Sequence, residues 1–217
     1  MVLKPPTRCS GLLLCAALTA FGGKPVKAVV ASSGIAPSDR DWRRVATPAD
    51  RARLRSWRGA WIDALAKVRT AGLAAPVDAD PALFDPDRAL PDATPPAGAY
   101  RCRVIKLGAH GTAMRDLTSY PPVDCRVDSD GGQVRLSKVG GGQRPVGVLF
   151  ADSSSRAVFL GTMLFGDEHR PLAYGRDGTR DLAGYVERIG VERWRLVLPS
   201  PRFESVLDVV EIVPAAR

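Results

Sequence analysis

The stretch Gly98-Ala-Tyr-Arg-Cys-Arg-Val-Ile-Lys-Leu-Gly108 decides how this chain of 217 residues is interpreted. It follows a proline-rich tract, and within it Tyr100, Cys102 and Val104 alternate with arginines. Successive side chains of a strand point to opposite faces, so this alternation predicts a half-buried β-strand. We interpret the stretch as the first strand of a β domain.

The same alternation recurs in short segments between residues 123 and 213. Turn sequences such as Asp130-Gly-Gly132 and Gly140-Gly-Gly142 separate them. About eight strands at this spacing predict an antiparallel meander, closed into a barrel or folded as a sandwich. We favour the barrel, because closure leaves no sheet edge exposed.

The clearest helix precedes this region. Thr47 supplies a capping hydroxyl, Pro48 occupies the first helical position, and Gly72 ends the helix. Apolar residues recur between them every three or four positions and form one stripe: Leu54, Trp57, Trp61, Ala64, Leu65 and Val68.

The fold class is therefore mainly β with one N-terminal helix, an α+β arrangement. We predict a helical arm over 40–72, a Pro-rich connector over 73–97 and a β domain over 98–214. In the connector, the frequent prolines argue against a regular helix or a central strand.

Residues 1–31 have the pattern of a secretion signal peptide. Lys4 and Arg8 precede the apolar run Gly11–Phe21, which is too short to span a bilayer. Small residues follow, and we expect cleavage between residues 20 and 31. The alternative is a buried N-terminal helix. No later stretch reaches transmembrane length, so we expect a periplasmic or secreted mature chain without a transmembrane segment.

The cysteines agree with export. Cys9 and Cys15 fall in the predicted signal, which leaves Cys102 and Cys125 as the pair in the mature chain. In an oxidising compartment such a pair is expected to form a disulfide bond. Both cysteines occupy the apolar phase of their strands and would point into one interior. Two buried free thiols are the alternative.

The positive charge is concentrated at the N-terminus. The chain has 31 Lys and Arg against 23 Asp and Glu, a net charge of +8. Residues 1–31 carry four cations and no acid, and their removal lowers +8 to +4. Elsewhere arginines and acids alternate. Nucleic-acid binding needs a basic patch rather than a net charge, so we predict no nucleic acid partner.

Catalytic chemistry finds little support. His110 and His169, the two histidines, lie in predicted loops. A metal site could be imagined from both with Asp167 or Glu168, but exposed turn residues fit this pattern better. A hydrolase needs a nucleophile beside an oriented histidine, and Ser153-Ser154-Ser155 lacks an elbow motif. We therefore predict no catalytic residue, no metal and no cofactor.

Five further side chains are candidates for binding, besides the two histidines. Trp57 and Trp61 could stack on a ligand, although packing against the β domain is the commoner use of such a pair. Arg193 and Arg195 flank Trp194 on a predicted strand. They could bind an anion or an acidic partner, or form the outward face of that strand.

The chain resembles a family of exported bacterial proteins classed as a domain of unknown function. The family has a Trp-containing N-terminal helix followed by a Gly-x-Tyr-x-Cys strand. The matching residues here are Trp57, Trp61, Gly98-Ala-Tyr-Arg-Cys102, Cys125 and the run from Tyr185 to Val213. The resemblance covers residues 40–214. It implies export and this fold, and no catalytic residue.

These observations favour a non-catalytic module of the cell envelope that binds a small ligand or an envelope protein. Barrels commonly hold ligands in their mouths. One alternative is a small envelope hydrolase that uses His110 or His169. Another is a proteinaceous inhibitor of an envelope protease, which rests on fold analogy.

Overall fold

The computed structural model describes residues 41–111, 113–202 and 204–216. The predicted signal peptide lies outside the described residues. The helices are α1 (Trp42–Val45), α2 (Pro48–Arg55), α3 (Trp57–Thr70), α4 (Ala75–Asp78) and α5 (Pro81–Phe84). The strands are β1 (Gly98–Ala109), β2 (Leu117–Ser119), β3 (Val123–Asp130), β4 (Gln133–Lys138), β5 (Gln143–Ala151), β6 (Ala157–Phe165), β7 (Asp181–Gly190), β8 (Arg193–Pro199) and β9 (Ser205–Pro214).

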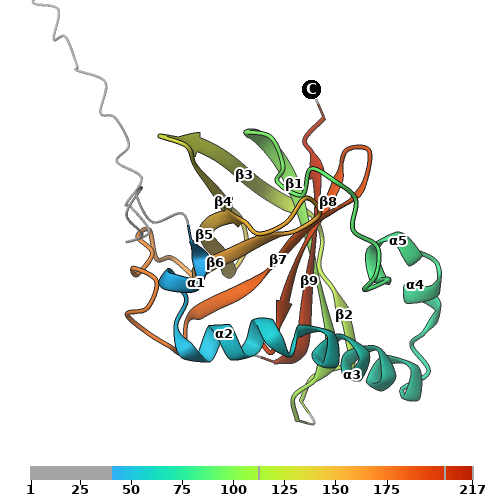
Figure 1. Ribbon diagram of the computed structural model, residues 1–217. Coiled ribbons are helices and arrows are strands. Elements are labelled where there is room, and N and C mark those ends of the chain that lie inside the picture. The colour runs from blue at the N-terminus through green and yellow to red at the C-terminus, as the bar shows by residue number, and fades with distance from the viewer. Residues whose placement is uncertain (1–40, 112, 203, 217) are drawn as a thin grey trace, which may run out of the picture.

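The strands form one antiparallel sheet that closes on itself (Figure 1). Its order is β2-β1-β3-β4-β5-β6-β7-β8-β9, and β1 also pairs with β9. Eight strands therefore form a closed barrel, which confirms the predicted fold. β2 is an extra strand. It pairs with β1 at Ile105–Leu107, beyond the stretch 98–102 that pairs with β3.

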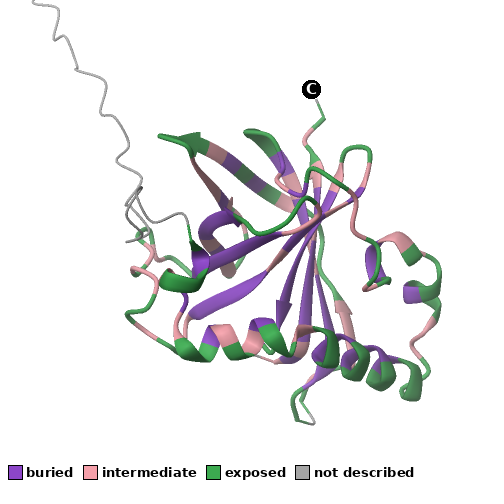
Figure 2. Ribbon diagram, viewed as in Figure 1, coloured by how far each residue is buried: buried purple, intermediate pink, exposed green. Residues whose placement is uncertain are grey.

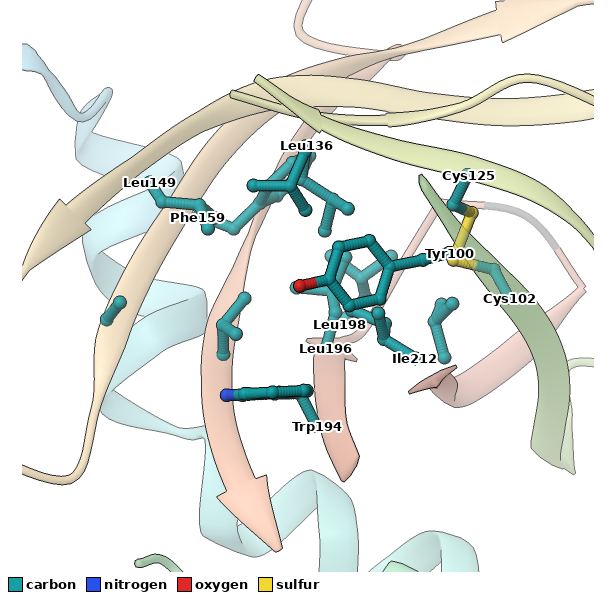
Figure 3. Packing of buried hydrophobic residues seen from close by; sticks show 14 of the residues in the cluster. Tyr100, Cys102, Cys125, Leu136, Leu149, Phe159, Trp194, Leu196, Leu198 and Ile212 are labelled. Atoms are coloured by element: carbon teal, nitrogen blue, oxygen red, sulfur yellow. A yellow bond between two sulfur atoms is a disulfide. The ribbon is translucent and has the colours of Figure 1, made fainter. Parts of the chain in front are cut away.

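One face of each strand fills the barrel with apolar side chains. Tyr100 and Trp194 meet edge to face inside it, with ring centroids 6.1 Å apart. Figure 3 shows them with Leu136, Phe159 and Leu196, which project from different strands into the same interior. This is the inward half of the alternation seen in the sequence.

The predicted disulfide is present. Cys102 on β1 and Cys125 on β3 are bonded, with their Cα atoms 5.8 Å apart (Figure 3). In the strand register Cys125 lies opposite Tyr100, so the bond joins neighbouring strands diagonally. Both cysteines are buried among the apolar side chains that fill the barrel, which we call the interior cluster.

The helices cover the outside of the barrel. α3 places Trp61, Ala64 and Val68 against apolar residues of β1, β8 and β9. Trp42 of α1 and Leu54 of α2 pack over β5, β6 and β7. Figure 2 shows the strands buried over much of their length and the helices exposed on their outer side. No helix in the described ranges is long and apolar enough to cross a membrane.

The single predicted helix is divided into α2 and α3. The break lies at Ser56, whose backbone adopts φ −93° and ψ 6°. Its hydroxyl donates to the carbonyl oxygens of Ala52 and Arg53. Serine hydroxyls that bond back to the preceding turn bend or interrupt helices, which accounts for the break.

The connector contains α4 and α5, although its prolines predicted no regular helix. Each helix has only four residues and carries proline in its first turn, where the missing N–H is not needed. Asp80 caps α5 by accepting a hydrogen bond from the Leu83 N–H. The prediction was wrong here because proline is unfavourable in the interior of a helix but is tolerated in its first turn.

The rest of the connector covers one end of the barrel. The Trp194 indole N–H donates to the Asp92 carbonyl at 3.3 Å, and the Tyr100 hydroxyl donates to the Pro96 carbonyl at 2.7 Å. Ala93 is buried in the interior cluster. The barrel is therefore closed at the end where Tyr100 and Trp194 lie.

We expect the Cys102→Ala/Cys125→Ala variant to lose about 3 kcal/mol of unfolding free energy, because the bond constrains the unfolded chain. Guanidinium denaturation under oxidising conditions measures the loss. The wild type in dithiothreitol is the control and should unfold at nearly the same midpoint as the variant. Equal stability of the variant and the oxidised wild type would contradict a stabilising role.

Glycines allow β5 and β6 to pack closely. Gly147 and Gly161 are opposite each other in the register. A Cβ on Gly161 would lie 2.3 Å from the Val146 carbonyl oxygen and 2.7 Å from the Phe159 ring. The backbone oxygen cannot move without displacing its strand. Any side chain here would therefore disturb the barrel wall.

We expect Gly161→Ala to lower the free energy of unfolding by about 2–3 kcal/mol through this clash. Gly59→Ala is the matched control. Gly59 lies on the exposed face of α3 with open space around it, so its replacement should stabilise the protein by about 0.5–1 kcal/mol. Urea denaturation measures both. A Gly161→Ala variant as stable as Gly59→Ala would contradict the close packing.

Candidate functional site at the barrel mouth

The end of the barrel away from Tyr100 and Trp194 contains a cavity of about 380 Å³. Its walls come from the second half of β1, the β2–β3 connection, the β4–β5 hairpin, β6, the end of β8 and the start of β9. The surface of the cavity is mostly apolar, and its lining includes Val104, Val123, Pro145, Met163 and Leu198. Small-molecule sites range from roughly 300 to 1,000 Å³, and this cavity falls within that range.

We call this end of the barrel, which contains the cavity, the mouth. Three charged side chains lie inside it. Lys106, Lys138 and Asp208 all line the cavity and are only 4%, 9% and 3% exposed. They lie on β1, β4 and β9, respectively. On each strand the residue is two positions from an apolar side chain that faces the barrel interior. Charged side chains are rarely buried to this extent unless they are paired or hydrogen-bonded.

Lys106 and Asp208 form a buried ion pair across the β1–β9 closure. They are register partners, and the Lys106 Nζ lies 3.1 Å from Asp208 Oδ2. Glu204 provides a second carboxylate 3.4 Å from the same nitrogen. The Ser205 hydroxyl donates to the other Asp208 oxygen. Burial raises the pKa of Asp208, while the ammonium and the hydroxyl lower it.

Lys138 is held differently. Its Nζ donates to the carbonyl oxygens of Gly140 at 2.7 Å and Gln143 at 2.9 Å, within its own hairpin. No carboxylate of the described ranges lies within ion-pair distance of it. Burial lowers the pKa of this amine, and the charges of Arg144 and Lys106 lower it further. Lys138 is thus a buried amine at the cavity wall without a counter-ion among the described residues.

The hairpin encloses this amine closely. Gly141 has φ +84°, a conformation that glycine adopts without strain. A Cβ at Gly141 would lie 2.8 Å from the Lys138 Nζ. Glycine at this position therefore permits the turn conformation and also leaves room for the Lys138 ammonium.

The two histidines are outside the cavity. His110 follows β1, is exposed, and its backbone N–H donates to the Glu204 carbonyl. His169 is exposed in the β6–β7 loop. Neither side chain contributes to the lining. Within the described part of the chain, no cluster of three His, Cys, Asp or Glu residues could hold a metal.

Trp57, Trp61 and Arg195 lie together between α3 and the outer barrel wall. The guanidinium of Arg195 stacks 4.6 Å from the Trp61 ring centroid and pairs with Glu187 at 2.6 Å, and it is fully buried. Trp57 packs edge to face on Tyr185, with ring centroids 5.8 Å apart. These contacts attach the helix to the barrel.

Arg193 and Trp194 point to opposite sides of β8. Arg193 faces outward and pairs with Asp80 and Glu211. Trp194 faces inward and contacts Tyr100 at the closed end. None of the seven residues singled out from the sequence lines the cavity.

The three charged residues of the mouth were not predicted, although the sequence contains a signal for them. Lys106 follows Val104 by two positions, Lys138 follows Leu136, and Asp208 precedes Val210. All therefore occupy the apolar phase of a strand. A charged residue in that phase indicates a charge turned into the barrel.

A model of the family described as a domain of unknown function, DUF4893, matches residues 42–212. The match extends from α1 into β9 and includes every residue that lines the cavity. No curated protein and no solved structure matches the chain.

We expect Lys106→Met to cost about 3–5 kcal/mol of unfolding free energy at pH 7.5, because the Asp208 carboxylate remains buried without its nearest cation. The deficit should be smaller at pH 5 than at pH 7.5. Burial raises the pKa of the Asp208 carboxyl, so a lower pH favours its uncharged form in the folded state. Urea titrations at both pH values measure the effect.

Lys106→Met/Asp208→Leu is the matched control, because it removes both charges and keeps apolar volume. It should recover most of the lost stability. A double variant whose loss equals the sum of the two single losses would contradict a direct coupling between Lys106 and Asp208.

Proposed function

The chain belongs to the DUF4893 family, a domain of unknown function, and we propose that it is a non-catalytic binding module that holds a small molecule in the mouth of its barrel. The observation that carries the proposal is the 380 Å³ cavity with buried charges in its wall. Buried charge is costly, and perturbed ionisable groups in a cavity are typical of functional sites.

The composition of the wall supports the same proposal. Small-molecule sites combine a largely apolar surface with a few polar groups that fix orientation. Here Val104, Met163 and Leu198 supply apolar surface, and the charged groups lie beside them in one mouth. A ligand could therefore bury its body and still satisfy a polar group.

A hydrolase is supported less well. Cleavage by a covalent route needs a nucleophile beside a general base. Among the described residues that line the cavity, there is no serine, cysteine or histidine. His110 and His169 lie outside it, which is why binding is proposed instead of cleavage.

The cell envelope is the proposed location, in the periplasm or outside the cell. Two features support it. The Cys102–Cys125 disulfide suits an oxidising compartment, and residues 1–31 have the composition of a secretion signal.

The test uses N-phenyl-1-naphthylamine, an uncharged apolar probe that fluoresces when it leaves water. We expect saturable binding to the wild type with one probe per chain. Val104→Trp should abolish the signal by filling the cavity, and Val123→Trp at its partly exposed rim should weaken it.

The matched control is Val191→Trp, since Val191 is 89% exposed on the β7–β8 turn and distant from the lining. It should bind the probe as the wild type does. Circular dichroism must show the same fold in all variants. Unsaturable binding, or full binding by both obstructed variants, would sink the proposal.

A further inference from the structure

The two lysines of the mouth differ in how their charge is balanced. Lys106 lies within 3.4 Å of two carboxylates, Asp208 and Glu204. Lys138 has only two carbonyl oxygens as partners in the described structure. An ammonium carries three donors, so one N–H of Lys138 is left for another acceptor.

The charges around Lys138 favour an incoming anion. Lys106 and Arg144 act on it as like charges and, together with burial, oppose its protonated form. The acids of the mouth are already engaged by Lys106. A negative group in the cavity would relieve the repulsion and replace the water that the amine has lost.

Lys138 could instead serve only to stabilise its own hairpin. This simpler explanation accounts for fewer features of the residue. Bonds to two carbonyls of its own hairpin could be made by an uncharged donor without the cost of burying a cation. The hairpin account also gives no reason for the amine to line a cavity. Its placement at the wall agrees with a role towards a ligand.

We infer that the ligand is an amphipathic monocarboxylate whose carboxylate binds the Lys138 ammonium and whose apolar body lies against Val104, Met163 and Leu198. This inference rests on the proposed function and names its ligand class. One free donor on a cation without a carboxylate partner among the described residues suits a single negative charge.

The experiment compares three probes of equal chain length: decanoate, decanol and decylamine. Each displaces N-phenyl-1-naphthylamine from the wild type at pH 7.5. Decanoate should bind about tenfold or more tightly than decanol, as expected for a charge-assisted hydrogen bond. Decylamine should bind most weakly, because Lys138 repels it.

Lys138→Met should lower the affinity for decanoate about tenfold, to the level of decanol, and leave decanol binding unchanged. Lys138→Gln keeps hydrogen-bond donors for the hairpin and serves if the methionine variant does not fold. Lys67→Met is the matched control. It removes the same charge from the exposed face of α3, where Lys67 donates to the Ala109 carbonyl, and should change no affinity.

The pH dependence gives a second readout. Only the protonated amine attracts a carboxylate, so decanoate affinity should fall as pH rises through the lowered pKa of Lys138, below the ordinary lysine value of about 10.4. The groups that face this amine or share its cavity are Lys106, Asp208, Glu204, Arg144 and Tyr120. The fall should be absent in the Lys138→Met variant.

The outcomes separate this inference from the function on which it rests. Equal binding of decanoate and decanol, or tightest binding of decylamine, would overturn the carboxylate and leave the binding module intact. Absence of any binding by the neutral fluorescent probe would overturn both. Decanoate selectivity that is lost only in the Lys138 variants would establish the inference.

Discussion

Pairing of β1 with β9 is the interaction on which the rest of the structure depends. It runs from Tyr100 opposite Pro214 to Ala109 opposite Ser205 and turns a meander into a closed barrel. The same pairing sets Lys106 opposite Asp208 at the mouth. It also creates the continuous outer surface of β1, β8 and β9 on which α3 packs. Core, helix attachment and candidate site therefore share one cause.

Buried charges occur in two distinct settings in this molecule. Beneath α3, the Arg195 guanidinium bonds to Glu187 and to the carbonyls of Leu83 and Arg88. That network pairs the guanidinium with a carboxylate and fixes the helix and the connector on the barrel. At the mouth, Lys138 lacks a carboxylate partner in the described structure and borders a cavity. Arg195 has a carboxylate partner and belongs to the scaffold, whereas Lys138 has none among the described residues and belongs to the candidate site.

The sequence predicted what depends on local periodicity. Strand alternation indicated the barrel, and the shared phase of Cys102 and Cys125 indicated the disulfide. The break at Ser56 was missed because it depends on a side-chain hydrogen bond that periodicity does not report. The site was missed because Lys106, Lys138 and Asp208 are far apart in sequence and meet only when the barrel closes. The tryptophans and arginines were predicted as binding candidates instead, and none of them lines the cavity.

The position of β9 in the sequence determines when the barrel can close during synthesis. The strand occupies Ser205–Pro214, while its partner β1 begins about a hundred residues earlier. A contact this distant in sequence forms late, and a chain that emerges from its N-terminus cannot close the barrel before Ser205–Pro214 has been synthesised. The Cys102–Cys125 bond joins strands only 23 residues apart and can form first. Until β9 arrives, one edge of β1 stays unpaired and α3 lacks much of its docking surface. A nascent chain halted before β9 would therefore expose an unpaired edge of β1 that can pair with strands of other chains.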